Sequence, residues 1–424
     1  MVLISRILKS QIFFMLLFIL HSPCINSQVI SQWRGDHRNG IYNETGLLDI
    51  WPEEGPELLW SVDEIGTGYS SATATGEMVY ITGMDDTLDV LTAIDLRGNI
   101  KWQTSYGHGW TNSYPGTRGS ATVEKDKVYV ISGNGEVVCL DAISGNIIWS
   151  VNGFDTFNGV CTMWGVSESP LIVDDKIIYT PGGSKTTMVA LDKGTGETIW
   201  ETESLIDSTA YVSPLLIEHD GRKLIATITA NYFFGVNPED GKVLWKYKYS
   251  DLKWNQTHWY SPIINCNTPL YHDGQVFITK GYDHLAAMFS LNKQGDKIEL
   301  LWTNEILDVH HGGMVLVDGY LYGANWQNNA TGNWCCIDWE TGEKMYEIEW
   351  QCKGSIISAD NKLYCFDEKR GNIALVEPTP EDFKIVSSFR ISKGTGPYWS
   401  HPAIRDGVLY IRHGEILMAY NIKQ

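Results

Sequence analysis

The amino-acid sequence predicts an all-β fold, an eight-bladed β-propeller of four-stranded antiparallel blades. The first observation is a segment that recurs about every 40 to 50 residues, a spacing typical of stacked supersecondary units. It reads AIDLRGNIKW up to Trp102, CLDAISGNIIW up to Trp149 and ALDKGTGETIW up to Trp200. The second observation is composition, because 41 glycines and 12% aromatic residues suit a large domain of sheets and tight turns.

Each repeat divides into four short strands, which we call a to d. From Ser120 to Trp149 apolar and polar residues alternate between turn signals, which is the pattern of half-buried strands. An aspartate and a glycine mark the turn between c and d, where Asp accepts backbone hydrogen bonds and Gly adopts a positive φ. We therefore assign to turns, and not to chemistry, the repeated aspartates Asp95, Asp141, Asp192 and Asp338.

Eight positions are predicted starts of strand a, and they give eight blades. The starts are Ser71, Ser120, Ser169, Ser213, Thr268, Gly313, Ser355 and His401. Six of them are Ser or Thr, which suits hydrogen bonding around a narrow channel. The last unit, from His401 to Ile422, contains only strands a to c, whereas PELLWSV, ending at Val62, resembles an isolated strand d. Their pairing would close the ring and remove the terminal sheet edges.

Three regions are expected along the chain: a signal peptide at 1–27, an N-terminal arm at 28–55 and a propeller domain at 56–424. Arg6 and Lys9 precede the apolar run from Ile12 to Leu20, which is the pattern of a secretory signal and is too short for a membrane span. We expect a periplasmic or secreted protein that is not an integral membrane protein. The residues before Cys24 do not favour lipid anchoring there.

Charge and cysteine content exclude two classes of protein. The formal net charge is −19 at pH 7, which disfavours nucleic acid as a partner. Seven of the eight cysteines lie beyond residue 27, an odd number without the spacing of a disulfide framework.

A monomer is expected. The arm carries Trp33, Arg34 and His37, which fit either a plug in the channel or packing across a blade.

The repeat LD-x-x-TG-x-x-x-W resembles that of the PQQ-like β-propeller superfamily. The resemblance covers about residues 56 to 422 and is specific for the fold. The superfamily includes quinoprotein dehydrogenases and BamB-type outer-membrane assembly lipoproteins, so the resemblance leaves the function open. It implies PQQ with calcium as cofactors in the first case and envelope proteins as partners in the second.

Functional side chains are expected at the channel mouth, which the segments from d to a and the turns from b to c should form. Two residues before each start of strand a, the residue type changes from blade to blade. We call these the rim positions: Tyr69, Arg118, Ser167, Tyr211, Cys266, His311, Lys353 and Trp399. Such variety is not needed to maintain the repeat.

Cationic and aromatic side chains at this mouth fit an anionic ligand, above all an acidic oligosaccharide with uronate or sulfate groups. Aromatic rings cover the apolar face of a sugar, and a guanidinium binds a carboxylate through two hydrogen bonds. The predicted ligand-binding residues are Arg118, Lys353, Trp399, Glu168, Trp110, Trp164 and Trp259.

The same residue types fit elimination or dehydration beside a uronate carboxylate. A cation would acidify the neighbouring C–H, an imidazole would remove the proton, and a phenol would protonate the leaving oxygen. The predicted catalytic residues are His310, His311, His401, Tyr69 and Tyr211.

Three alternatives stay open from the sequence. The first is a non-catalytic interaction scaffold. The second is a quinoprotein dehydrogenase, for which we find no matching set of calcium ligands and only the pair Cys335 and Cys336 in a predicted strand c. The third is a metal site that combines His310 and His311 with His401 and Glu168, but no HxxxH or CxxC spacing supports it. We predict no metal and no resident cofactor.

Overall fold

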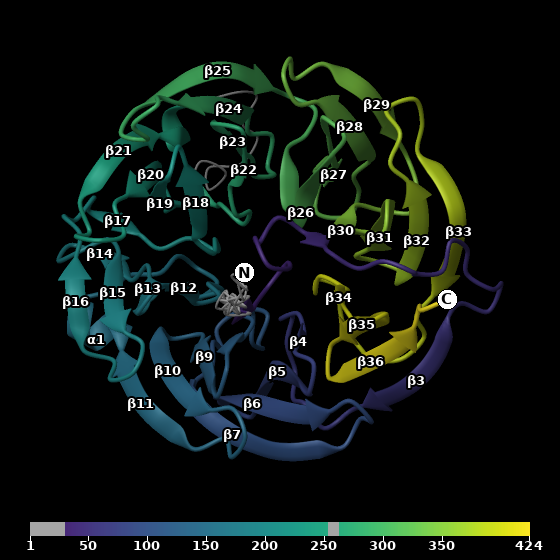
Figure 1. Ribbon diagram of the computed structural model, residues 1–424, viewed down its shortest axis with the longest axis horizontal. Coiled ribbons are helices and arrows are strands. Elements are labelled where there is room, and N and C mark those ends of the chain that lie inside the picture. The colour runs from purple at the N-terminus through teal and green to yellow at the C-terminus, as the bar shows by residue number, and fades with distance from the viewer. Residues whose placement is uncertain (1–29, 253–262) are drawn as a thin grey trace, which may run out of the picture.

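The chain forms a closed ring of eight four-stranded antiparallel sheets around a central axis (Figure 1). This computed structural model describes residues 30–252 and 263–424, so the predicted signal peptide lies outside the described residues. Two of the sheets gain a fifth, short strand from the N-terminal arm. The eight-bladed all-β fold predicted from the repeats is confirmed.

The strands of blades 1 to 7 follow one another in the chain, whereas blade 8 takes its outer strand from the N-terminal end. Blade 1 comprises β4 (Thr73–Ala74), β5 (Met78–Asp85), β6 (Leu88–Asp95) and β7 (Ile100–His108), and blade 2 comprises β8 (Thr122–Glu124), β9 (Lys127–Ile131), β10 (Glu136–Asp141) and β11 (Ile147–Asn152). Blade 3 comprises β12 (Leu171–Val173), β13 (Lys176–Tyr179), β15 (Val189–Asp192) and β16 (Thr198–Glu201). Blade 4 comprises β18 (Leu215–His219), β19 (Arg222–Ile228), β20 (Tyr232–Val236) and β21 (Val243–Lys248).

Blade 5 comprises β22 (Leu270–His272), β23 (Gln275–Ile278), β24 (Ala286–Leu291) and β25 (Ile298–Asn304), and blade 6 comprises β26 (Val309–Val317), β27 (Tyr320–Asn325), β28 (Trp334–Asp338) and β29 (Lys344–Ile348). Blade 7 comprises β30 (Gly354–Ala359), β31 (Lys362–Asp367), β32 (Asn372–Glu377) and β33 (Lys384–Arg390). Blade 8 comprises β34 (Ala403–Arg405), β35 (Val408–His413), β36 (Ile416–Asn421) and β3 (Glu57–Val62).

Short elements complete the structure: β1 (Ile30–Ser31), β2 (Ile41–Tyr42), β14 (Gly182–Gly183), β17 (Asp207–Ser208), α1 (Gly153–Phe157) and the 3-10 turn η1 (Tyr249–Asp251). Within the described ranges, no helix combines the length and the apolar character that crossing a membrane requires. Apolar side chains fill the spaces between neighbouring sheets; between blades 1 and 2, for example, Leu91 of β6 belongs to the same buried cluster as Val128 and Leu140.

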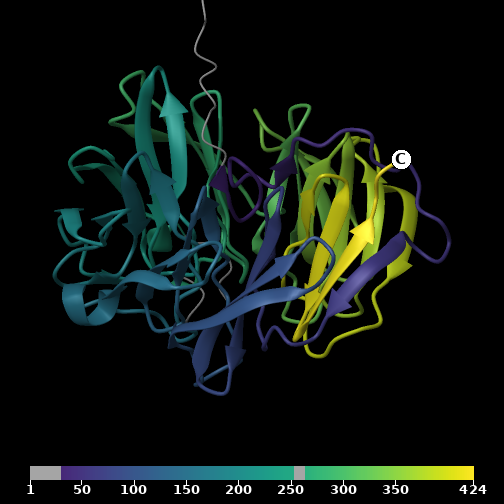
Figure 2. The same cartoon turned by 60° about the horizontal axis from the view of Figure 1, so that its bottom comes forward.

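Blade 8 combines both ends of the chain. Strand β3 pairs antiparallel with β36, with Glu57 opposite Asn421 and Val62 opposite Leu417. In Figure 2 the purple β3 lies beside the yellow strands of the same blade. The predicted closure of the ring by PELLWSV is therefore confirmed, and it gives the last blade the outer strand that its own repeat lacks.

Tryptophans on the outer strands of five blades donate hydrogen bonds to the next blade. Trp149 of blade 2 donates its indole N–H to the carbonyl oxygen of Lys193, in the c–d turn of blade 3, at 3.1 Å. A Cβ on Gly196 in that turn would lie 2.8 Å from the Trp149 ring, and its φ of 77° also favours glycine. Asp192 accepts backbone N–H bonds within the same turn. The indole-to-carbonyl bond recurs at other junctions from Trp60, Trp102, Trp200 and Trp245.

Hydroxyl groups at the starts of strand a form a second belt, around the channel. The backbone N–H of Ser71 donates to Oγ of Ser120, that of Ser120 to Oγ of Ser169, and that of Ser169 to Oγ of Ser213, at 2.9, 3.0 and 2.9 Å. Each bond joins one blade to the next. The hydrogen-bonding role predicted for these hydroxyls is thus confirmed in blades 2 to 4.

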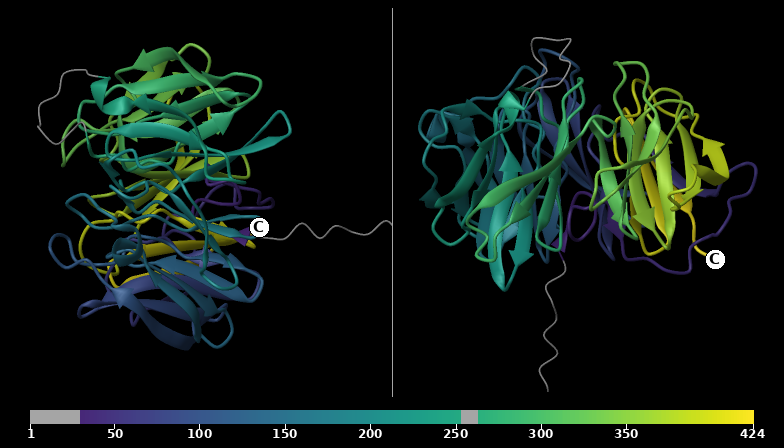
Figure 3. Two further views of the ribbon diagram at one scale, coloured as in Figure 1. Left: turned by 90° about the vertical axis from the view of Figure 1, so that its left-hand side faces the viewer. Right: turned by 90° about the horizontal axis from the view of Figure 1, so that it is seen from above.

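The N-terminal arm crosses the channel. Strand β1 pairs antiparallel with β8, the innermost strand of blade 2, and β2 pairs parallel with β30 of blade 7. The arm therefore enters and leaves on the face of the a–b turns, where the C-terminus also lies (Figure 3). Residues 32–40 connect β1 to β2 at the centre of the ring, as the purple segment in Figure 1 shows. Of the two arrangements open from the sequence, the arm adopts the plug.

Arg34 ties the arm to the last three blades. Its guanidinium donates to the carbonyl oxygens of Met314 and Ile356 at 2.6 and 2.9 Å and to Nδ1 of His401 at 2.8 Å. Burial lowers the pKa of Arg34 to about 10, so the side chain stays charged at neutral pH. One buried side chain thus joins blades 6, 7 and 8.

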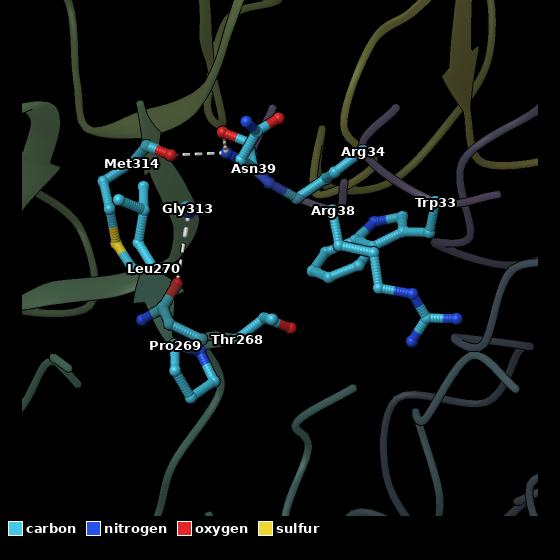
Figure 4. Close-up of a pocket in the computed structure, with 10 residues that line it drawn as sticks. Trp33, Arg34, Arg38, Asn39, Thr268, Pro269, Leu270, Gly313 and Met314 are labelled. Atoms are coloured by element: carbon cyan, nitrogen blue, oxygen red, sulfur yellow. Dashed lines mark hydrogen bonds between the residues drawn. The ribbon is translucent and has the colours of Figure 1, made fainter. Parts of the chain in front are cut away.

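Arg38 makes the equivalent contacts on the opposite side of the channel. Figure 4 shows the Arg34 and Arg38 side chains pointing in opposite directions. Arg38 donates to the carbonyl oxygens of Ser169 and Pro214, both at 3.0 Å, and to that of Pro170. Burial lowers the pKa of Arg38 to about 9, and the nearby Glu168 partly offsets this effect. The arm is therefore also fixed to blades 3 and 4.

The contacts of Arg34 explain the two blades whose strand a does not start with Ser or Thr. Gly313 has a φ of 71°, and a Cβ there would lie 2.3 Å from Nη1 of Arg34. His401 supplies the ring nitrogen that accepts a hydrogen bond from Arg34. Both departures from the repeat make room for the arm or bind it.

Replacement of Arg34 by methionine is expected to lower the free energy of unfolding by about 3 kcal/mol or more. Two carbonyl oxygens and an imidazole nitrogen would lose hydrogen bonds to a charged donor, worth about 1.5 to 3 kcal/mol each. Chemical denaturation followed by tryptophan fluorescence measures the change. As a control, His37→Ala alters an exposed side chain of the same segment and should cost less than about 0.5 kcal/mol. Unchanged stability of Arg34→Met would contradict the structural role of the plug.

Candidate functional site

A cavity of about 490 Å³ opens on the face of the ring formed by the d–a segments and the b–c turns, which we call the loop face. Its size falls within the range of small-molecule sites, about 300 to 1,000 Å³. The arm approaches from the other face and contributes Trp33 to the lining, together with Ser169, Ser213 and His401 at starts of strand a. The plug therefore turns the channel into a cup that is closed at one end.

The rim positions predicted from the repeat form most of the wall of this cup. Seven of the eight line the cavity: Tyr69, Arg118, Ser167, Tyr211, Cys266, His311 and Trp399. Of the other predicted site residues, Trp164, His310 and His401 also line it. The alignment of the blades thus brings together residues that are far apart in the sequence. Their ligand-binding and catalytic roles stay predictions.

Aromatic rings cover much of the wall. The ring of Trp399 lies 5.0 Å from that of Tyr69 and 5.2 Å from that of Tyr114, between ring centres. Across the cup, Trp164 and Tyr211 lie 5.3 Å apart, and the Tyr211 hydroxyl accepts the backbone N–H of Trp164 at 2.9 Å. Burial raises the pKa values of Tyr69 and Tyr211, so both phenols are protonated at neutral pH. The wall offers flat apolar faces with hydroxyl groups at their edges.

Arg118 brings a positive charge to this aromatic wall. Its guanidinium carbon lies 5.8 Å from the centre of the Tyr69 ring. It donates to the carbonyl oxygens of Ser113, Tyr114 and Gly116 at 2.8 to 3.0 Å. Burial lowers the pKa of Arg118, and no carboxylate of the described residues lies within ion-pair distance of it. The charge is oriented by backbone contacts and is not neutralised by an acid.

His311 lies beside a buried ion pair. Its Nε2 is 3.2 Å from Oε2 of Glu368, and Nζ of Lys353 is 2.7 Å from Oε1 of the same carboxylate. Burial alone would raise the pKa of Glu368, but its contact with His311 and the charges of His311 and Lys353 lower it to about 2. Glu368 is therefore ionised, and Lys353 balances its charge.

The three histidines differ in the nitrogen atoms that they leave available. Arg34 donates to Nδ1 of His401, so Nε2 of His401 carries the proton and donates to the carbonyl oxygen of His311 at 2.8 Å. Both ring nitrogens of His401 therefore have hydrogen-bond partners, and its catalytic role stays a prediction. Nε2 of His310 lies 2.8 Å from the Tyr282 hydroxyl, while its Nδ1 is buried without a hydrogen-bond partner in the part of the chain that the structure describes.

Three predicted ligand-binding residues do not line the cavity. Lys353 has a side chain that is 2% exposed, because it is buried against Glu368. Glu168 is fully buried and accepts the backbone N–H of Thr180 at 3.2 Å. The indole of Trp110 donates to Ser113 at 3.2 Å, within a d–a segment. A fourth residue, Trp259, lies outside the described residues.

The sequence did not single out Glu368, which lines the cavity together with Lys369. They follow β31, in the b–c turn of blade 7. The pattern FDEKRGN at this turn carried a signal, since three consecutive charged residues follow Asp367 there. Trp33 was considered as part of a plug, but its position in the cavity lining required the path of the arm.

Comparison with known proteins assigns the chain to a family. A sequence profile described as outer membrane protein assembly factor BamB matches residues 89–347, more than half of the chain. The chain belongs to this family. This result agrees with the PQQ-like repeat identified in the sequence.

Sequence relatives of this BamB family member include proteins of different kinds. An uncharacterized protein of Rickettsia conorii is 24% identical over 251 residues, which cover 56% of this chain and 55% of the relative. A quinoprotein ethanol dehydrogenase of Pseudomonas putida is 27% identical over 158 residues, which cover 34% of this chain and 24% of the enzyme. The chain thus matches about half the length of the first relative and a quarter of the second.

Solved structures share the fold at low sequence identity. BamB from Moraxella catarrhalis aligns with a TM-score of 0.61 and 14% identity, covering 86% of this chain and 99% of that one. Quinohemoprotein alcohol dehydrogenase from Comamonas testosteroni aligns with a TM-score of 0.64 and 12% identity, covering 88% of this chain and 77% of that one. At such identity these likenesses show the propeller alone.

The cavity lining does not fit a quinone held with calcium. Calcium binds six to eight oxygen ligands, usually including several carboxylates. Among residues 30–252 and 263–424, Glu368 is the only carboxylate that lines the cavity, and its Oε1 already accepts from Lys353. The pair Cys335 and Cys336 lies in β28 as two buried free thiols, and neither lines the cavity.

Glu168→Gln is expected to change the pH dependence of stability. Burial raises the pKa of Glu168 to about 8, so the folded protein binds a proton there that the unfolded chain releases above about pH 4.3. Stability contributed by this proton is present below pH 4 and is lost as the pH rises towards 8. The variant should therefore become more stable relative to wild type with increasing pH, by up to about 1.4 kcal/mol per unit. Denaturation at several pH values tests this, and parallel curves would refute it.

Proposed function

We propose that the protein binds an acidic saccharide in the cup on its loop face. The observation that carries this proposal is the placement of Arg118 and Lys369 beside the aromatic wall, with the only lining carboxylate among the described residues already balanced by Lys353. The cup therefore has a positive excess charge, although the chain has a net charge of −19. A local field of this kind concentrates anions.

The shape of the wall supports a ring-shaped polar ligand. Trp399 and Tyr69 present ring faces that can pack on the apolar face of a sugar, while hydroxyl groups at Tyr69 and Ser167 border the same space. The volume of about 490 Å³ suits one or two sugar rings. A uronate carboxylate or a sulfate would bind to the cations by charge-assisted hydrogen bonds.

The predicted signal peptide supports a location outside the cytoplasm, where acidic polysaccharides are available. Elimination or dehydration of the bound saccharide remains a prediction from the residue types in the cup. The candidate bases are His310, His311 and His401, and the candidate acids are Tyr69 and Tyr211. His401 is the least favourable of the bases, since both of its ring nitrogens have hydrogen-bond partners.

Lys369→Gln is expected to weaken the binding of a trigalacturonate about tenfold, because one hydrogen bond to a charged group is lost. Isothermal titration calorimetry of the wild type and the variant measures the change. Arg370→Gln is the matched control, since Arg370 is an exposed cation at the next position that does not line the cavity. A neutral galactose trisaccharide should bind more weakly than trigalacturonate. Equal affinity for the two sugars, or no binding of either, would refute the proposal.

A second candidate function is a protein-interaction scaffold in the cell envelope. The family match, together with the alignment over 99% of BamB from Moraxella catarrhalis, favours it. In this function the cup would be incidental, and the partner would contact exposed loops or blade edges. Affinity purification from membranes of the native host should then recover outer-membrane assembly proteins in stoichiometric amounts. Their absence, together with saccharide binding in the cup, would exclude the scaffold as the main function.

A further inference from the structure

Two histidines and a glutamate, side chains of types that can ligate metals, meet on one side of the cup. His310 and His311 come from the start of β26 and Glu368 from the turn after β31. One potential ligand atom from each residue lies within 4.8 Å of the other two, and all three residues line the cavity. Two imidazoles and one carboxylate are a donor set that divalent transition metals bind.

A bulge allows both adjacent histidines to face the same space. In a regular strand, neighbouring side chains point to opposite faces. Val309 pairs with Asn325 and Met314 with Gly323, so β26 contains more residues than β27 between these two pairs. This bulge interrupts the alternation, and the ring centres of His310 and His311 lie only 4.4 Å apart. The usual objection to adjacent histidines as ligands of one ion does not hold for this backbone.

The atoms in question lack ordinary hydrogen-bond partners. Among the described residues, Nδ1 of His310 is buried without a hydrogen-bond partner, and Nε2 of His311 has only its 3.2 Å contact with Oε2 of Glu368. Buried polar atoms without partners are rare in native proteins. Two ligands bound to one tetrahedral ion at about 2.1 Å lie about 3.4 Å apart, close to the spacing of this pair.

Lys353 holds the carboxylate in a suitable orientation. Its ammonium group is 2.7 Å from Oε1 of Glu368 and donates to the carbonyl oxygen of Asn328 at 2.9 Å. Oε1 is thereby engaged, and Oε2 is left on the side of His311. Carboxylate ligands of metals are commonly held by such a second hydrogen-bonding group.

We propose that His310, His311 and Glu368 bind one divalent transition-metal ion in the cup. Three protein ligands leave an open coordination position, as in catalytic zinc sites, and this position faces the cavity. The neighbouring cations Lys353 and Lys369 weaken the binding of the ion alone, whereas an anionic ligand at the open position strengthens it. This last step rests on the proposed function, but the ion site itself does not.

His311 has two proposed roles, as a metal ligand and as a general base. A nitrogen that binds the ion cannot accept a proton, so metal binding and general-base catalysis at Nε2 exclude each other. The site differs from the metal site considered from the sequence, because His401 is engaged by Arg34 and Glu168 is buried away from the cavity. Glu368 takes the place of both.

Titration of the EDTA-treated full-length protein with Zn²⁺ tests the ion site. Calorimetry should show one ion per chain, and His311→Ala should lower the affinity at least about tenfold. His311→Ala is expected to fold, since its side chain is 22% exposed at the cavity wall. His272→Ala is the matched control, because His272 is an exposed histidine next to Asp273 that would account for adventitious surface binding. No saturable binding, or equal affinity in His311→Ala, would overturn the proposal.

Galacturonate and galactose test the open position. By thermodynamic reciprocity, galacturonate should raise the Zn²⁺ affinity by the factor by which Zn²⁺ raises the galacturonate affinity. Galactose, which lacks the carboxylate, should leave the Zn²⁺ affinity unchanged. One bound Zn²⁺ that His311→Ala removes, without any effect of galacturonate, would support the ion site and refute the acidic ligand. If galacturonate still raises the Zn²⁺ affinity of His311→Ala, the saccharide site is supported and the ion site at His311 is refuted.

Discussion

The contact between a tryptophan of one blade and a glycine turn of the next is the constraint on which the ring depends. The indole packs where a Cβ would collide with it and donates to a carbonyl oxygen of the same turn, as Trp149 does at Gly196 and Lys193. The glycine must therefore stay a glycine for reasons of both space and backbone conformation. This explains why the segment that dominates the sequence repeats so faithfully and why its residues carry no ligand chemistry.

The arm imposes a different constraint, on the inner belt. Serine hydroxyls join successive blades around the channel, and this regular pattern changes where Arg34 reaches the wall, at Gly313 and His401. A histidine that resembled a catalytic base in the sequence is thus a fixed acceptor for an arginine. Because the same arm closes the channel, the cup owes its depth to residues that come before the first blade.

The sequence was sufficient to predict the fold and the rim, because both follow from counting along a repeat. Seven of eight rim positions reach one cavity for this reason. The sequence was insufficient to predict whether a given side chain points into the cavity or towards a buried partner. Lys353 lies at a rim position, yet it turns towards Glu368, which is 15 residues further along the chain and in a turn that the repeat does not define. Such pairing depends on distances between two loops, and a repeat pattern does not contain them.

The family and the cup constrain function at different levels. The BamB family match and the likeness to quinohemoprotein alcohol dehydrogenase rest on strands, turns and interblade tryptophans, which every function on this scaffold needs. The wall of the cup is built from positions that the scaffold leaves free. Its carboxylate is already paired, which is unfavourable for binding calcium. Uncompensated cations lie beside aromatic rings, which is favourable for binding an anion. The chemistry of this protein is therefore better argued from Arg118, Glu368 and Lys369 than from the repeat that reveals its fold.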